Sequence, residues 1–251
     1  QFDFQTQAIL YEGPGSAGYV STWHDTCEET RELVMCYDMI FDSIKSDAEL
    51  ITFLSQKAQE TGVSNPKARF EDIQRNIEDN ILRDALANPD KIHSNYPRAE
   101  ILKAIITKVL PEPEEAFWAL VDPMLQKATA VDGVTGEKGL AGYSSYVITA
   151  LANFLAEFSK ADPTFLAQCM ERAPRLSETY RFFIDTMCLQ QYYPHTGDDG
   201  HFAARVNQYV GMQFLKPGGN PAGFSSWTVL PPSNFKLLWD LYEATGDPAY
   251  V

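Results

Sequence analysis

Apolar residues recur every three or four positions along most of the chain, and this spacing is typical of amphipathic α-helices. Prolines and helix-capping residues stand at the start of several of these segments. The pattern predicts about nine or ten helices: over 26–44, from a capping box at Ser46–Glu49, from Asn65–Pro66 to Leu82, from Pro97, from Pro113, from Gly142, from Asp162–Pro163, and around 175–190, 201–215 and 233–244.

Alternation with a period of two, the pattern of half-buried strands, is almost absent, and only Gln7–Tyr11 and Trp227–Leu230 could be short extended pieces. Short loops rich in glycine and proline join the helices. No repeat of fixed length is present, which argues against the folds of the common solenoid families. The chain is therefore expected to be all-α, with antiparallel helical hairpins that follow one another in a toroid or helical array.

The composition is that of a globular protein: 45% of the 251 residues are hydrophobic, enough for a substantial core. Twenty basic and 34 acidic residues give a net charge of −14, and such an acidic surface repels nucleic-acid phosphates and anionic lipids. No apolar run approaches the roughly 18–20 residues of a membrane span. We therefore expect neither nucleic acid nor a membrane as a partner.

The two ends of the sequence favour a piece of a longer chain. The sequence begins at Gln1 without a basic-then-apolar signal segment. At the other end, Thr245–Val251 has the composition of a helix C-terminus followed by the start of a new element. We therefore expect a fragment.

Four cysteines are too few for a disulfide scaffold in a chain of this length. Cys27 and Cys36 are nine residues apart in one predicted helix, about 13 Å, which is too far for a disulfide, and Cys36 is interpreted as a core residue. Cys169 and Cys188 could pair, although buried thiols are favoured. The G-x-G-x-x-G match at Gly13–Gly18 lacks a βαβ unit and is interpreted as a flexible loop, so neither a metal nor a cofactor is expected.

Three polar loops are the strongest candidates for a functional site. The first lies just before a predicted helix and contains the imidazole of His93, the amide of Asn95 and two cations, Lys91 and Arg98. Between positions 91 and 108, four basic residues accompany one acidic residue, a local charge of +3. Such a positive mouth on an acidic protein would select an anionic ligand; a solvated loop with a helix cap is the alternative.

The second loop, 131–146, contains glycines that let the backbone approach a ligand, and it leads Tyr143 and Tyr146 onto an apolar helix. The third, 192–202, combines Tyr192, His195 and His201 with two carboxylates, and aromatic faces with polar tips suit a sugar. For both loops the alternative is that the tyrosines only fill the core.

Four short segments, taken in order, resemble the heparinase II/III-like polysaccharide lyases. They are the Tyr-Asp pair at 37–38, the loop from Asp-Gly to Gly-Tyr at 132–143, the Pro-His-Thr-Gly-Asp turn at 194–198, and the helix-ending Thr-Gly-Asp-Pro at 245–248. The resemblance implies an incomplete (α/α) toroid as a single domain over 1–251 that continues into a β-sandwich. It also implies a periplasmic or secreted enzyme that cleaves an anionic polysaccharide by β-elimination without a cofactor.

Carried over residue by residue, the resemblance implies Tyr143 as the catalytic tyrosine, with Tyr146 in reserve, and Asn95 as the group that neutralises the uronate carboxylate. The assisting histidine stays open among four candidates: His93, His195, His201 and His24. The residues assigned to substrate binding are Lys91, Arg98, Tyr146, Tyr192 and His201.

These residue types suit an elimination. The C5 proton of a uronate is weakly acidic because the carboxylate is already negative, so hydrogen bonds from Asn95 and His93 would disperse the charge of the enolate-like intermediate. A tyrosine that acts as a base needs cations nearby, and Lys91 and Arg98 are candidates. The phenol or a histidine then protonates the departing oxygen.

Two other functions stay open. A toroidal glycoside hydrolase would use two carboxylates, such as Glu137 with Asp198 or Asp199. A non-catalytic module would only hold a glycan or a partner protein, with aromatic residues such as Tyr192 contributing to binding. The particular polysaccharide, endo or exo action and the oligomeric state are left open.

Overall fold

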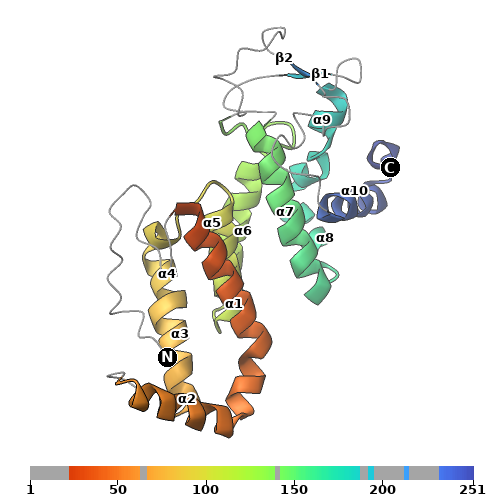
Figure 1. Cartoon of the computed structure of the whole chain (residues 1–251). Coiled ribbons are helices and arrows are strands. Elements are labelled where there is room, and N and C mark those ends of the chain that lie inside the picture. Colours follow the sequence, from red (N-terminus) through yellow and green to blue (C-terminus); the bar gives the residue numbers. More distant parts are fainter. Residues whose placement is uncertain (1–22, 63–66, 139–141, 187–191, 195–211, 215–231) are drawn as a thin grey trace. The chain divides into compact units, whose positions relative to one another are not determined.

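The computed structural model describes residues 23–62, 67–138, 142–186, 192–194, 212–214 and 232–251 (Figure 1). These residues are predominantly helical, which confirms the all-α prediction, with one short antiparallel pair of strands in addition. The chain divides into two compact units, Gln1–Leu120 and Val121–Val251, which are described separately. The toroid and its continuation into a β-sandwich stay predictions.

The first unit contains helices on both sides of a π-helical turn. In order they are α1 (Trp23–Ser46), α2 (Ala48–Glu60), α3 (Phe70–Ile77), the π-helical η1 (Glu78–Arg83), α4 (Asp84–Ala87), the 3₁₀ helix η2 (Pro89–Ile92) and α5 (Arg98–Val109). Helix α6 (Glu114–Ala128) includes the boundary between the units. Helix α1 packs against α5 and η2, and the apolar side chains of these elements form the core of the unit.

Two details of the first unit differ from the prediction. Helix α2 is capped by Asp47, not by Ser46, since the Asp47 carboxylate accepts a hydrogen bond of 2.8 Å from the Leu50 N–H. The predicted helix up to Leu82 changes to π-helical form at Glu78, whose Oε1 accepts a 2.8 Å hydrogen bond from the buried Tyr37 hydroxyl. This contact comes from α1, 41 residues away, and local periodicity cannot reveal it. Asn65–Pro66 lies outside the described residues.

Cys36 is exposed, so its assignment to the core is wrong. Nine residues correspond to about two and a half helical turns, so Cys36 lies on the face of α1 opposite the buried Cys27. Cys27, Cys36 and Cys169 are free thiols: the first two do not pair with each other, as predicted, and Cys169 is a buried free thiol, the state favoured for it. Cys188 lies outside the described residues.

The second unit is organised around α7 (Gly142–Ala161), which packs against α8 (Phe165–Arg172) and α10 (Pro232–Thr245) (Figure 1). Between them come the 3₁₀ helix η3 (Pro174–Glu178), α9 (Arg181–Thr186), and the strands β1 (Tyr192–Pro194) and β2 (Met212–Phe214). The 3₁₀ helix η4 (Pro248–Tyr250) follows α10 and begins at the proline of the Thr-Gly-Asp-Pro segment, which confirms that a new element starts after the helix C-terminus.

A buried polar network joins α10 to the rest of the second unit. The Tyr180 hydroxyl donates a 2.7 Å hydrogen bond to Oδ1 of Asn234, and the Asn234 amide lies 3.3 Å from Oγ1 of Thr149 on α7. Asn234 is fully buried, so these partners satisfy groups that would otherwise be costly to remove from water. Burial raises the pKa of Tyr180 well above its usual range.

Two helix predictions in the second unit are wrong in part. The predicted helix over 175–190 divides into η3 and α9, and Thr179 and Tyr180 between them are buried in the core. Within the predicted helix over 201–215, Met212–Phe214 is a strand that pairs antiparallel with Tyr192–Pro194. Pairing between segments distant in sequence is a tertiary effect that helical periodicity does not register. Gln7–Tyr11 and Trp227–Leu230 lie outside the described residues.

In the part of the chain that the structure describes, no helix combines the length and the apolar character needed to cross a membrane.

Candidate functional site

The first candidate loop lies in the first unit, between η2 and α5. The Arg98 N–H donates a 2.9 Å hydrogen bond to the Asn95 carbonyl and closes a turn at the start of α5. His93 is exposed, Asn95 is half-buried, and Ser94 is buried. The predicted amide and imidazole therefore belong to one short, ordered loop.

Carboxylates outside the 91–108 segment offset its positive charge. Lys91 pairs with Asp84 of α4, and the Arg98 guanidinium lies 3.1 Å from Oε1 of Glu28 on α1. Lys108 likewise pairs with a glutamate at the start of α6. The expected positive mouth is therefore much weaker than the local sequence indicates, because the compensating acids come from other helices.

Cys27 of α1 is close to this loop, and Arg98 is among its electrostatic neighbours. Burial, together with a smaller contribution from the nearby Glu28 carboxylate, raises the pKa of the Cys27 thiol to about 12. The thiol therefore stays protonated at neutral pH and is unsuited to act as a nucleophile.

The second candidate loop, in the second unit, begins with a tight hairpin turn. Val131 and Val134 exchange two backbone hydrogen bonds, of 2.8 and 3.0 Å. The two residues between them, Asp132 and Gly133, have φ angles of 49° and 81°, which is the left-handed combination of a type I′ turn. The Asp-Gly pair of the sequence thus makes a tight hairpin turn.

Gly133 is required by packing inside the protein. A Cβ atom at this position would lie 2.5 Å from the carbonyl oxygen of Glu178, at the end of η3, and closer still to the carbonyl carbon. The sequence interpretation assigned the close backbone approach to a ligand. The structure shows that the backbone of η3 occupies that place for this glycine.

Two side chains fix the loop at either end of the turn. Arg175 of η3 donates a 2.6 Å hydrogen bond to the carbonyl of Ala130, and Ser144 of α7 donates its hydroxyl proton to the carbonyl of Thr135. Ser144 is fully buried and immediately follows Tyr143. The start of α7 is therefore tied to the turn and, through the turn, to η3.

Tyr143 lies beside a lysine from the same loop. The ammonium of Lys138 lies 4.6 Å from the centroid of the Tyr143 ring, well within the roughly 6 Å range of a cation–π contact. Lys138 is exposed and Tyr143 is half-buried, so the pair borders solvent. The hydroxyl oxygen of Tyr146, one turn later, is buried. Of the two predicted tyrosines, Tyr143 is thus the one beside an exposed positive charge.

Glu137, the carboxylate that the hydrolase alternative would use, lies 3.0 Å from the ammonium of Lys127 on α6. This ion pair offsets the negative charge that Glu137 places next to Lys138.

The third candidate loop is described only at its start. Tyr192 is the first residue of β1, where it pairs with Phe214 of β2, and its side chain is not described. His195, His201, Asp198 and Asp199 lie outside the described residues. His24 lies in α1, with its side chain likewise outside the description. Among the described side chains, no group of three or more histidines, cysteines and carboxylates is arranged to hold a metal ion.

The structure therefore brings the predicted residues together in two sets. In the first unit, His93 and Asn95 lie in the loop between η2 and α5, with Lys91 and Arg98 in the helices on either side, while Tyr143 and Tyr146 lie at the start of α7 in the second unit. Their convergence on one sugar stays a prediction. Comparison of the chain with protein-family models, curated proteins and solved structures returned no match.

Sequence reasoning missed Lys138 as the cation beside Tyr143 and named Lys91 and Arg98 instead. The available signal was its position in the same glycine-rich loop, five residues before the tyrosine. Lys138 has a φ angle of 61°, an unusual backbone conformation for a lysine. The residue spacing alone does not reveal a contact that depends on this backbone reversal.

Proposed function

We propose that the chain is the helical part of a polysaccharide lyase that cleaves uronic-acid-containing polysaccharide by β-elimination. The observation that carries the proposal is the contact between Lys138 and Tyr143 at the start of α7. It places a phenol and an exposed ammonium next to each other, and hydrogen bonds from Arg175 and Ser144 hold the preceding turn at Ala130 and Thr135. Such a pair suits a substrate that carries both a carboxylate and a weakly acidic C–H bond.

In this proposal Tyr143 is the catalytic residue. Its phenolate oxygen accepts the C5 proton, the electrons of the C–H bond form the C4–C5 double bond, and the bond from C4 to the glycosidic oxygen breaks. The phenol then returns the proton to the departing oxygen, so the residue ends in its starting form. The products are a new reducing end and a 4,5-unsaturated uronate.

Lys138 supplies the positive charge that the substrate requires. Because the chain as a whole is strongly acidic, an anionic polymer needs a local cation to approach the surface. The ion pair between Lys127 and Glu137 offsets the acid next to Lys138 and so favours this role. Neutralisation of the uronate carboxylate by Asn95 and His93 remains a prediction from the resemblance, and the proposal is argued from the second unit alone.

The proposal is tested by the chemical nature of the products. The protein is incubated with polymers of uronic acid and with alternating uronic acid–hexosamine polymers, and both ultraviolet absorbance and reducing ends are measured. Elimination produces the two signals together, since each cleavage creates one conjugated double bond. If reducing ends appear without ultraviolet absorbance, and the Glu137→Gln variant no longer produces them, the reaction is a hydrolysis. If the polymer binds but neither signal appears, the protein is a non-catalytic module.

A further inference from the structure

The C-terminal segment of the chain forms an ordered structure after α10. Gly246 has a φ angle of 70° and donates a 2.8 Å hydrogen bond to the Tyr242 carbonyl, which ends the helix. Asp247 then caps η4 by accepting a 2.9 Å hydrogen bond from the Ala249 N–H. Tyr250 at the end of η4 is only 6% exposed. The segment Gly246–Tyr250 is therefore packed onto the unit.

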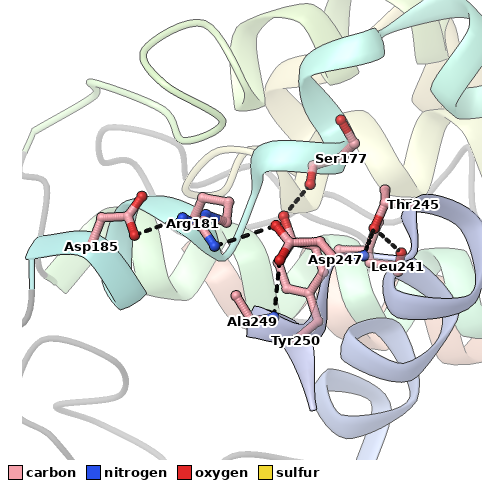
Figure 2. A network of polar contacts seen from close by, with 8 residues as sticks. All are labelled: Ser177, Arg181, Asp185, Leu241, Thr245, Asp247, Ala249 and Tyr250. Atoms are coloured by element: carbon pink, nitrogen blue, oxygen red, sulfur yellow. Dashed lines mark hydrogen bonds and ion pairs between the residues drawn. The ribbon is translucent and has the colours of Figure 1, made fainter.

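Two contacts attach this segment to η3 and α9, as Figure 2 shows. The Tyr250 hydroxyl donates a hydrogen bond to the carbonyl of Ser177 in η3. The Asp247 carboxylate lies 3.3 Å from the guanidinium of Arg181 on α9, and the same guanidinium lies 2.9 Å from Asp185. The C-terminal segment thus contacts both elements that flank the buried Thr179.

The same short helix, η3, contacts the turn that precedes Tyr143. Its Arg175 holds the carbonyl of Ala130, and the backbone of its Glu178 packs against Gly133 with no room for a side chain. Ser177, which accepts the hydrogen bond from Tyr250, lies between these two contact residues. A displacement of η3 would therefore displace the turn.

From the turn, the path to the proposed base is short. The carbonyl of Thr135 accepts the hydrogen bond of Ser144, the neighbour of Tyr143, and Lys138 of the same loop contacts the Tyr143 ring. We propose that the segment Gly246–Tyr250 positions Tyr143 against Lys138 through η3 and the 131–134 turn, with Tyr250 as a positioning residue. The importance of this positioning for catalysis rests on the proposed function, whereas the positioning itself does not.

The positioning is tested with a spectroscopic signal that needs no activity. A lysine side chain over a tyrosine ring experiences a ring-current shift of its ε-methylene protons in nuclear magnetic resonance spectra, and the Tyr143→Leu variant identifies that shift. Tyr250→Phe keeps the buried ring and removes only the hydroxyl. We expect it to reduce the Lys138 shift about two-fold or more, because the loop then samples open arrangements. Tyr242→Phe, which removes a hydroxyl from α10 outside this path, should leave the shift unchanged.

A second variant removes the contact between η3 and the turn at Arg175, whose side chain is exposed to solvent. Arg175→Met removes the hydrogen bond to Ala130 and should reduce the Lys138 shift in the same direction as Tyr250→Phe. If both variants are folded and keep the wild-type shift, the positioning role is wrong, whatever the activity of the protein. If Tyr250→Phe fails to fold, the Arg175→Met result decides.

The activity assay separates this inference from the proposed function. If the wild-type protein catalyses elimination, the two variants should lower kcat and raise KM, since they separate the Tyr143 base from Lys138, the cation proposed to bind the uronate carboxylate. Reduced ring-current shifts in a protein without elimination activity would support the positioning and reject the lyase. Elimination with wild-type kcat in both variants would support the lyase and reject the positioning.

Discussion

Replacing Gly133 by alanine tests the packing of the turn against η3. The substitution introduces two separate costs. The φ angle of 81° is left-handed, which costs an alanine about 1 kcal/mol. The new Cβ would also lie 2.5 Å from the Glu178 carbonyl oxygen, and relieving such an overlap typically costs about 1–3 kcal/mol. We therefore expect Gly133→Ala to lower the free energy of unfolding by about 3 kcal/mol.

Gly246 offers a matched control in the same unit. Its φ angle of 70° is also left-handed, but a Cβ atom there would meet no atom within 4 Å, so Gly246→Ala should cost only about 1 kcal/mol. The reduced chain entropy of the unfolded state affects both variants alike and cancels in the comparison. Equilibrium urea unfolding followed by circular dichroism measures the two values. Equal destabilisation of the two variants would refute the close contact between the turn and η3.

Three further outcomes follow from individual contacts. Asp47→Ala should lower the free energy of unfolding by about 1 kcal/mol in urea titrations, because it removes the α2 cap, whereas Ser46→Ala should have a smaller effect; the reverse order would contradict the assigned cap. In native protein at pH 8, iodoacetamide should alkylate the exposed Cys36 well before the buried Cys27, whose pKa is raised to about 12, and peptide mass spectrometry that finds equal rates would overturn this assignment. Burial raises the pKa of Tyr250 to about 12, above its ordinary value of 10, so the contribution of its phenol to stability is complete below pH 10 and is lost as the pH rises towards 12. In urea titrations between pH 10 and 12, the free energy of unfolding should therefore fall less steeply with pH for Tyr250→Phe than for the wild type. Equal slopes for the two proteins would contradict the burial of the Tyr250 phenol.

The long amphipathic helices could be predicted closely from the sequence. The start of α7 at Gly142 coincides with the predicted position, and α10 extends the predicted 233–244 by one residue at each end. In both helices the side chains that face the core recur at helical spacing. The information that determines them is therefore local.

Elements that depend on distant partners could not be predicted. The interruption between η3 and α9 coincides with the burial of Tyr180, whose hydroxyl binds Asn234, 54 residues away. The strand at 212–214 exists through its pairing with Tyr192–Pro194. Neither interaction changes the spacing of apolar residues within the segment itself.

In the candidate site, too, features set by the local sequence could be predicted and contacts with distant residues could not. The position of Tyr143 at the start of an apolar helix, after a glycine-rich loop, follows from local sequence. The contact with Lys138 depends on a left-handed backbone conformation, and the need for Gly133 depends on a backbone segment 45 residues later. In the first unit, the charges of Lys91 and Arg98 are offset by acids on other helices, which a local charge count overlooks.

The most direct test of the account is the rate of appearance of unsaturated uronate in the wild-type protein and in two variants that each lose one phenolic hydroxyl. With a uronic-acid polymer that the wild type cleaves, Tyr143→Phe should lower the ultraviolet signal by about 10²–10⁴-fold, the usual contribution of a positioned acid–base group. Tyr242→Phe should retain the wild-type rate. Wild-type elimination by Tyr143→Phe, or cleavage without any ultraviolet signal, would contradict the assignment of Tyr143 as the base of a lyase.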